Sequence, residues 1–267
     1  KDCKIAIDEN NGDIEKSIEF LRKKGIAKAS KKMGRVAADG LVLIFEKDNS
    51  MSIIEINSET DFVAKNNDFK NFCKEISELN FINKSNIQSL KSCKMKNQKT
   101  VDENLIALIS KMGEKITLRR AKFFENSGIN FSYVHNSLEK NVGKVVSIVQ
   151  LSKNSKKDLK DLGSKLAMHI AAQSPLAIDE RGINKDTLDK ELEIIKAELK
   201  NSGKKPEMIE KISSGKIKKF ISDNTLLNQV WIMDTKKKVN QVVKEYSDGE
   251  EIKVLDFARF KVGEGID

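Results

Sequence analysis

Two stretches of the chain repeat one order of local patterns, strand, turn, strand and helix, and this repeat constrains the fold most. Runs of β-branched residues flanked by turn residues predict a hairpin in each stretch, and apolar residues at helical spacing follow. The first stretch has strands at 41–46 and 51–56 and a helix at 61–79, and the second has strands at 130–136 and 142–151 and a helix at 157–173. Because a helix can bury one face of a hairpin, the repeat predicts a duplicated α+β core of two subdomains.

Helical patterns lie on both sides of this core. Near the start, Ile14 and Ile18 begin an apolar stripe, and Gly25 is placed to end that helix. Two short helices bury little surface alone, so we expect a third helix upstream. The chain begins at Lys1 without a methionine, and we expect that it is trimmed at this end. Near the other end, two helices within 206–248 each carry one apolar seam, which predicts an antiparallel helical arm.

The predicted fold is therefore α+β, and it has four parts. The β-prone segment Ile116–Phe124 should join the first sheet, and alternating residues after Gly249 predict a strand that returns to the second sheet. The predicted parts are an incomplete N-terminal helical module at 1–34, a first core subdomain at 35–128, a second core subdomain at 129–205 completed by the returning strand at 249–267, and a protruding helical hairpin at 206–248.

The charge of the chain raises nucleic acid as a partner. The formal net charge is +9, but the lysines are scattered over most predicted helices and mixed with 40 acidic residues. Only 6% of the residues are aromatic, and we find no repeat of aromatic and basic residues that would stack nucleotide bases. Solvated helix faces explain most of this charge, so we expect no specific nucleic-acid site. An RNA- or ribosome-associated basic protein stays the alternative function.

Other whole-chain features indicate a cytoplasmic protein. No apolar run approaches the roughly 20 residues that a membrane span needs, and no secretory signal is visible. The three cysteines, Cys3, Cys73 and Cys93, form no CxxC pair, and their odd number favours reduced thiols. We therefore expect neither a membrane partner nor a disulfide framework.

The sequence lacks the residue constellations of an enzyme. Its two histidines, His135 and His169, have no cysteine or histidine neighbour at metal-ligand spacing, and there is no phosphate-binding GxxxxGK[ST] loop. No cysteine has a nearby histidine or basic cluster that would mark a nucleophile. We therefore expect no catalytic residues, no metal and no cofactor. The remaining functional classes are a binding module, a regulator of another protein, and a scaffold that dimerises through the arm.

The strongest candidate for a binding site is the junction between the strand MSIIEI (51–56) and the next helix. Thr60 is a credible N-cap, and Asp61 in the first turn suits the helix dipole. Phe62 follows in that first turn, where its ring can either pack in the core or project toward a partner. The residues alone favour the core for Phe62 and a capping role for Asp61.

With its surroundings, this junction resembles the TDFVAK signature of the bacterial elongation factor Ts family. Further motifs occur in the order and with nearly the spacing of that family, and agreement over several separated motifs is far more specific than one short match. The motifs are GDIEKSIEFLRKKG (12–25), KASKKMGRVAADG (28–40), KMGEKITLRRA (111–121) and GSKLAMHIAAQSP (163–175).

The resemblance implies a guanine-nucleotide exchange factor for elongation factor Tu, in its GDP-bound and nucleotide-free forms. It implies that Phe62 is inserted into the partner, and that Thr60, Asp61 and Val63 fix the entry and displace the partner's magnesium. It further implies partner contacts at Val142, Gly143, His169, Lys4 and Lys32. The family's N-terminal module has three helices, of which the first would be missing here. From the residues alone, His169 reads as a core or rim group, Gly143 as a bulge or a close backbone approach, and the two lysines as ordinary surface residues.

Overall fold

The computed structural model describes residues 2–153, 158–203, 205–247 and 250–266. Helices and antiparallel strands are both abundant, and the predicted α+β class is confirmed. The chain forms two compact units. Unit 1 comprises Lys1–Glu125, Val134–Val146 and Phe260–Asp267, and unit 2 comprises Asn126–Tyr133 and Ser147–Arg259.

Unit 1 is built on a four-stranded sheet with the order β3-β2-β1-β5. β1 and β2 form the predicted hairpin, and its turn residues Asp48 and Asn49 both have positive φ, as the tight turn between twisted strands requires. β3 pairs with β2 as predicted. The strands are β1 (Asp39–Lys47), β2 (Ser50–Ser58), β3 (Ile116–Phe124) and β5 (Val142–Gly143).

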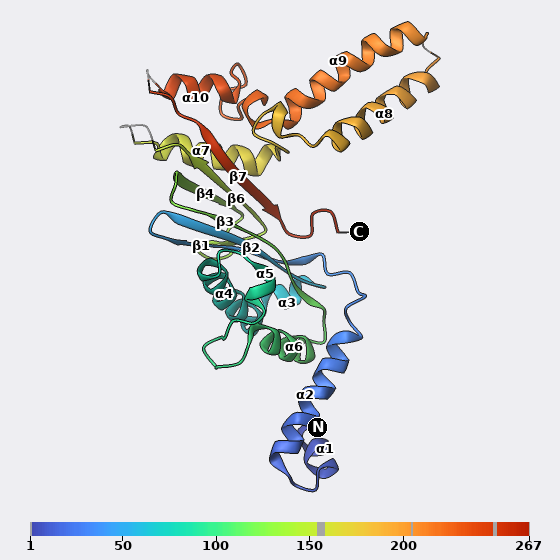
Figure 1. The fold of residues 1–267 in the computed structure, drawn as a ribbon, viewed down its shortest axis with the longest axis vertical. Helices are drawn as coiled ribbons and strands as arrows, with labels where there is room; N and C mark the ends of the chain where they lie inside the picture. Colours follow the sequence, from blue (N-terminus) through green and yellow to red (C-terminus); the bar gives the residue numbers. More distant parts are fainter. Residues whose placement is uncertain (1, 154–157, 204, 248–249, 267) are drawn as a thin grey trace. The chain divides into compact units, whose positions relative to one another are not determined.

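Helices cover one face of this sheet (Figure 1). Phe69 and Ile76 of α4 are fully buried against Leu43 and Ile54 of the sheet. A capping box fixes the start of α6. The Thr100 side chain accepts a hydrogen bond from the Glu103 amide, and the Glu103 side chain accepts one from the Thr100 amide. The helices are α3 (Asp61–Lys65), α4 (Asn67–Ile82), α5 (Ile87–Leu90) and α6 (Val101–Met112).

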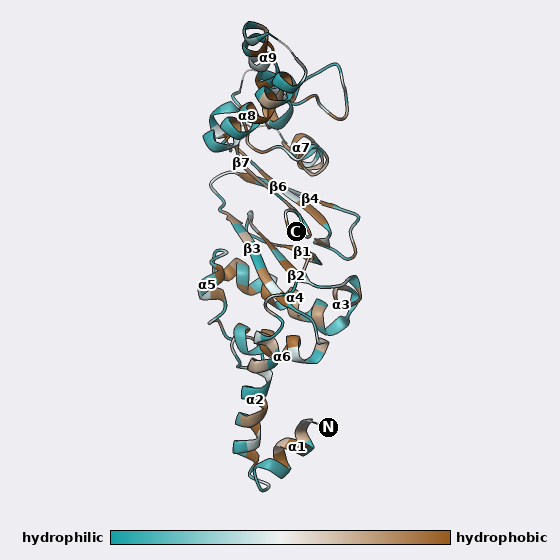
Figure 2. Ribbon diagram, turned by 90° about the vertical axis from the view of Figure 1, so that its right-hand side faces the viewer, coloured by the Kyte–Doolittle hydropathy of each residue, from teal (hydrophilic) through white to brown (hydrophobic). Residues whose placement is uncertain are grey.

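The N-terminal helices α1 (Asp2–Glu9) and α2 (Ile14–Ser30) differ from the prediction at Gly25. α2 does not end there but runs five residues further. A Cβ on Gly25 would lie 3.3 Å from the hydroxyl oxygen of Ser110, so glycine lets α2 pack closely on α6. The predicted apolar stripe is largely exposed, with Ile14 at 70% and Ile18 at 62%. Figure 2 shows hydrophobic and hydrophilic residues alternating along the ribbon of α2.

Unit 2 contains a three-stranded sheet with the order β4-β6-β7. The returning strand is confirmed as β7, next to β6, and α7 packs with Leu162, Leu166 and Ile170 in the hydrophobic core. The predicted start of this helix at Lys157 lies outside the described residues. The elements are β4 (Ile129–His135), β6 (Val145–Leu151), β7 (Val254–Lys261) and α7 (Lys160–Gln173).

The predicted strand 142–151 is divided in the structure. Val142 and Gly143 form β5 and pair with Leu43 and Val42 of β1, whereas β6 belongs to the other sheet. Neighbouring atoms approach Gly143 closely, because a Cβ there would lie 2.5 Å from the side-chain atom Cγ1 of Val134 and 3.2 Å from the backbone oxygen of His135. The glycine thus lies where one continuous run of β-branched residues passes from the first sheet to the second.

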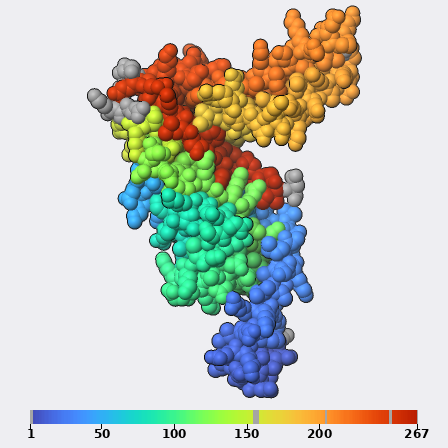
Figure 3. All heavy atoms as spheres, in the orientation of Figure 1, coloured from blue at the N-terminus to red at the C-terminus, as the bar shows by residue number. Residues whose placement is uncertain are grey.

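The antiparallel hairpin consists of α8 (Lys185–Asn201) and α9 (Pro206–Asn224), which differs from the predicted arm within 206–248. Ile195 and Leu199 of α8 pack on Ile209 of α9. The last helix, α10 (Val239–Ser247), instead buries its apolar seam in the core of unit 2, together with Trp231 and Leu226. Figure 3 shows the hairpin standing clear of the rest of its unit. Two short 3-10 helices, Glu180–Gly182 and Leu226–Asn228, lie in the connections before and after it.

Candidate functional site

The junction between β2 and α3 presents one large aromatic side chain to solvent. The Phe62 side chain is 80% exposed, the largest exposure among the large apolar side chains of the described residues. The next two residues, Val63 and Ala64, are buried in the core of unit 1. The alternative in which Phe62 belongs to the core is therefore wrong, and the ring is available to a partner.

Helix α3 is a separate short element, whereas the sequence predicted one helix over 61–79. Asn66 has ψ of 136°, which breaks the helix, and its side chain accepts a hydrogen bond of 2.8 Å from the Asp68 amide to cap α4. Thr60 occupies the predicted N-cap position of α3 and has extended backbone angles. Its hydroxyl, however, donates to Glu114 at 2.7 Å and makes no cap bond within the described residues.

Positively charged side chains interact with Asp61, the residue before Phe62. Lys65 donates a 2.6 Å hydrogen bond to Asp61, and this bond lowers the pKa of the Asp61 carboxyl. Lys144, which directly follows Gly143, bonds to Asp39 and, at 2.9 Å, to the carbonyl of Gly40. Lys144 also acts electrostatically on Asp61. The structure therefore brings the Phe62 junction and the segment around Gly143 into the same charged environment.

The candidates Val142 and Gly143 lie in unit 1 but are both buried, Val142 within the hydrophobic core. The exposed apolar side chain of this segment is Leu138, at 49%, whose amide donates to the carbonyl of Val142 at 3.0 Å. Leu138 lies in the turn between the predicted strands at 130–136 and 142–151. A leucine inside an otherwise polar turn was the signal that could have identified it as a surface contact.

His169 lies on α7 in unit 2 and is fully buried. Nε2 is 2.9 Å from Oε1 of Gln229, Nδ1 accepts from the Ile232 amide at 3.4 Å, and the ring stacks on Trp231 with 5.1 Å between centroids. Burial lowers the pKa of His169, against the opposing effect of the Gln229 hydrogen bond. These contacts match the reading of His169 as a core group, and a direct partner contact through its ring would need a local opening.

The two candidate lysines have different surroundings. Lys4 is exposed on α1. Lys32 is half-buried, and its ammonium group donates to the carbonyl of Gly113, the left-handed residue that ends α6. Lys32 therefore stabilises the end of a helix, besides any contact that it makes outside the chain.

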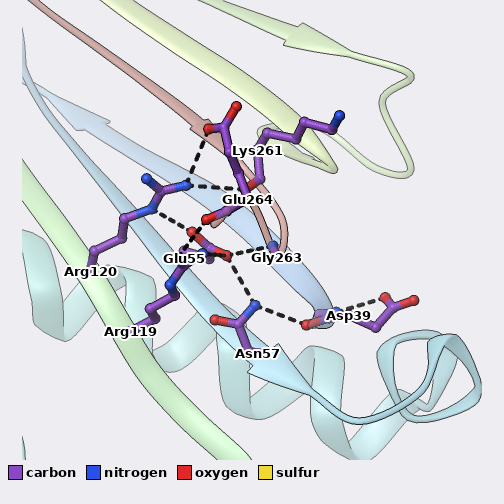
Figure 4. Close-up of polar contacts among 9 residues, drawn as sticks. Asp39, Glu55, Asn57, Arg119, Arg120, Lys261, Gly263 and Glu264 are labelled. Carbon is purple, nitrogen blue, oxygen red and sulfur yellow. Dashed lines mark hydrogen bonds and ion pairs between the residues drawn. The ribbon is translucent and has the colours of Figure 1, made fainter. Parts of the chain in front are cut away.

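Sequence reasoning also missed a buried ionic network in unit 1, shown in Figure 4. The Glu55 side chain is fully buried on β2, 3.0 Å from Arg119 and 2.5 Å from Arg120. It also accepts from the Gly263 amide at 2.9 Å, so it ties the C-terminal segment to the sheet. A β-bulge in β3 places both arginines opposite Glu55, because Arg120 pairs with Glu55 and the register then shifts by one residue.

The hydrogen bonds of this network determine the ionisation of Glu55. Burial raises its pKa, but hydrogen bonds from Asn57, Gly263 and Arg120 outweigh burial, and the net effect lowers the pKa. The carboxylate is therefore charged at neutral pH. The adjacent arginines in β3 and the acid within MSIIEI were the sequence signals for this network.

Within the described residues, no group of three or more His, Cys, Asp or Glu side chains is arranged to hold a metal. Burial raises the pKa of the Cys73 thiol, which keeps it protonated. Among the described residues, no helix is both long enough and hydrophobic enough to cross a bilayer.

Comparison with known proteins gives one consistent family. The elongation factor TS family model matches residues 59–264. A protein named elongation factor Ts from Xanthobacter autotrophicus is 42% identical over 271 aligned residues, which cover all of this chain and 88% of the relative. Elongation factor Ts from Rickettsia akari is 41% identical, with all of this chain and 87% of the relative covered.

Proposed function

Because the chain belongs to the elongation factor Ts family, a family of translation elongation factors, we propose that it is a guanine-nucleotide exchange factor for elongation factor Tu. In this proposal it binds elongation factor Tu with GDP, promotes GDP release and stays bound to the nucleotide-free form. The chain performs no covalent step, and the magnesium ion involved belongs to the partner.

The observation that carries the proposal is the 80% exposure of Phe62 next to a buried Val63. The well-packed neighbour holds this large aromatic side chain in solvent. Its burial by a partner would therefore lower the free energy of the complex. Full burial of a phenylalanine is worth about 1.5–3 kcal/mol. We propose that the Phe62 ring enters the partner's nucleotide domain and disturbs its magnesium and phosphate site, with Asp61 beside it and with Thr60 and Val63 holding it in place.

Thermodynamic linkage relates the effect of the factor on GDP binding to the effect of GDP on binding of the factor. If the factor weakens GDP binding by some ratio, GDP must weaken binding of the factor by the same ratio. A thousandfold effect corresponds to about 4 kcal/mol. Phe62 can supply a large part of that energy, and the remainder must come from a broader interface. For that interface we propose Lys4, Lys32, the Val142–Gly143 segment with its exposed neighbour Leu138, and the surface around His169.

The test is the rate of fluorescent GDP release from purified elongation factor Tu at fixed magnesium concentration, with and without this chain. The chain should accelerate release, and Phe62→Ala should remove most of the acceleration. Ile82→Ala is the matched control, because Ile82 is also apolar and 69% exposed in unit 1 but lies at the far end of α4. Equal activity of the Phe62→Ala and Ile82→Ala variants would refute the proposal.

A further inference from the structure

Two glutamates hold the junction from which Phe62 projects. Glu59 accepts a hydrogen bond of 2.6 Å from the backbone amide of Lys115, and Glu114 accepts one of 3.0 Å from the backbone amide of Thr60. Each carboxylate thus binds the amide of the residue that follows the other glutamate. We infer, on the premise of the exchange function proposed above, that Glu59 and Glu114 form a reciprocal clamp that positions Phe62 for insertion into the partner.

Every backbone and side-chain polar group of Thr60 is hydrogen-bonded, its amide and hydroxyl by Glu114 of the clamp. Besides the amide, the Thr60 hydroxyl donates to Glu114 Oε1 at 2.7 Å. The Thr60 carbonyl accepts from the Ser58 hydroxyl at 3.0 Å and from the Ala64 amide at 3.4 Å. Both peptide planes that flank Thr60 are therefore held. Because Phe62 follows only two residues later, their orientation determines the direction in which its ring leaves the fold.

The other half of the clamp connects the junction to a third segment. Arg35, in the connection between α2 and β1, lies 3.2 Å from Glu59 Oε2, and the Lys115 ammonium donates to the Arg35 carbonyl at 2.7 Å. Glu59 is only 19% exposed, which limits screening of these bonds by solvent. Segments around residues 35, 59 and 115, far apart in the sequence, are thus joined at the base of α3.

Helix α3 needs such external support. It has five residues, too few for an isolated helix to be stable in water. The hydroxyl that usually caps a helix start is used by Glu114 instead. Val63 and Ala64 fix one side of α3 in the core, and the clamp fixes Thr60, the residue before its first turn. Without the clamp, rotation about the Thr60 backbone would spread the Phe62 ring over many directions and reduce the population ready for insertion.

Glu103 provides a matched control for Glu114. Glu103 lies at the start of α6, whereas Glu114 follows Gly113, the residue that caps its end. Glu103 accepts a hydrogen bond from the Thr100 amide at 2.9 Å and one from the Thr100 hydroxyl at 3.1 Å. The two carboxylates therefore make the same pair of bonds to a threonine. Only Glu114 makes them to the junction that carries Phe62. Glu103→Ala should disturb local stability to a similar extent without changing the direction of Phe62.

The experiment is a double-mutant cycle on GDP release from elongation factor Tu, at saturating concentration of the full chain. Glu114→Ala should slow release by about tenfold when Phe62 is present and by less than about twofold in the Phe62→Ala background, because a positioning residue acts only through the group that it positions. Glu103→Ala should leave the rate unchanged in both backgrounds. Equal effects of Glu114→Ala with and without Phe62 would overturn the clamp.

Two additional measurements keep the test decisive. Thr60→Val removes one bond of the clamp and leaves α6 and β3 untouched, so it should give a smaller, equally Phe62-dependent loss even if Glu114→Ala fails to fold. Amide hydrogen exchange at Thr60 should accelerate in Glu114→Ala but not in Glu103→Ala, and unchanged exchange would refute the clamp. If Phe62→Ala itself had no effect on release, the proposed function would fail, whereas a loss in Phe62→Ala without any loss in Glu114→Ala would remove the clamp alone.

Discussion

Phe62 and Val63 are adjacent in the chain but lie in opposite environments, since the Phe62 side chain is 80% exposed and that of Val63 is 7% exposed. Successive residues of a helix point about 100° apart, so a short helix at the edge of a core can bury one and expose the other. The same five-residue element α3 thus combines an anchor and a projecting ring.

This pair gives the first prediction. Phe62→Ala should change the free energy of unfolding by less than about 0.5 kcal/mol, because the ring gains little from its own fold. Val63→Ala should lower it by about 2 kcal/mol, because it leaves a cavity in the core. Urea denaturation of both variants measures the difference. Strong destabilisation by Phe62→Ala would show that the ring packs within the chain.

The second prediction concerns the network around Glu55. Glu55→Gln should lower the free energy of unfolding by about 3 kcal/mol at neutral pH, since it leaves Arg119 and Arg120 without their buried counter-charge. Glu46→Gln, at an exposed position of the neighbouring strand, is the control and should change it by less than about 0.5 kcal/mol.

The pH dependence of this loss follows from the lowered pKa of Glu55. A carboxyl with a lower pKa in the folded state contributes stability above its unfolded pKa, and this contribution disappears as pH falls through the folded pKa. The difference between the original chain and Glu55→Gln should therefore be largest at neutral pH and shrink on acidification below the ordinary glutamate value of 4.5. A difference independent of pH would contradict the ionic role.

The third prediction concerns His169, whose pKa is lowered by burial. Below the ordinary value of 6.5, the unfolded chain binds a proton that the folded chain does not, so acidification favours unfolding. Between pH 7 and pH 5.5 the free energy of unfolding should fall, and His169→Gln should flatten this fall. An unchanged slope in His169→Gln would contradict the assignment.

The fourth prediction compares two buried serines. The Ser52 hydroxyl is fully buried on β2 and has no hydrogen-bond partner among the described residues, whereas that of Ser147 donates to the Ala167 carbonyl at 2.6 Å. Ser52→Ala should therefore raise the free energy of unfolding by about 1 kcal/mol, and Ser147→Ala should lower it by about 1 kcal/mol. Thermal or urea unfolding measures the sign of both changes in the free energy of unfolding. Destabilisation by Ser52→Ala would indicate that the Ser52 hydroxyl is hydrogen-bonded.

Local patterns were sufficient for several elements. Alternating β-branched residues around Asp48 and Asn49 predicted the β1–β2 hairpin, and the run Ile116–Phe124 predicted β3. Each of these signals lies within the element that it specifies, so no distant contact was needed to interpret it.

Other features depended on residues far away in the sequence. Gly25 looks like a helix end, but the approach of Ser110 gives it a packing role inside α2. The apolar seams of the predicted arm did not reveal that α9 packs on α8, and that α10 belongs to a different core. Periodicity identifies a buried face, but only the folded chain determines what covers that face.

For the candidate site, the sequence by itself determined that a strand ends near Ile56, that a helix starts near Asp61, and that the motifs are those of one family. It could not decide the position of Phe62, for which the residues alone favoured the core. The tertiary structure decided it, because Val63 and Ala64 fill the space beneath α3, and Glu114, 54 residues beyond Thr60, takes the hydroxyl that would have capped the helix. Exposure and hydrogen-bond partners are set by contacts between distant segments, and these exist only after the chain has folded.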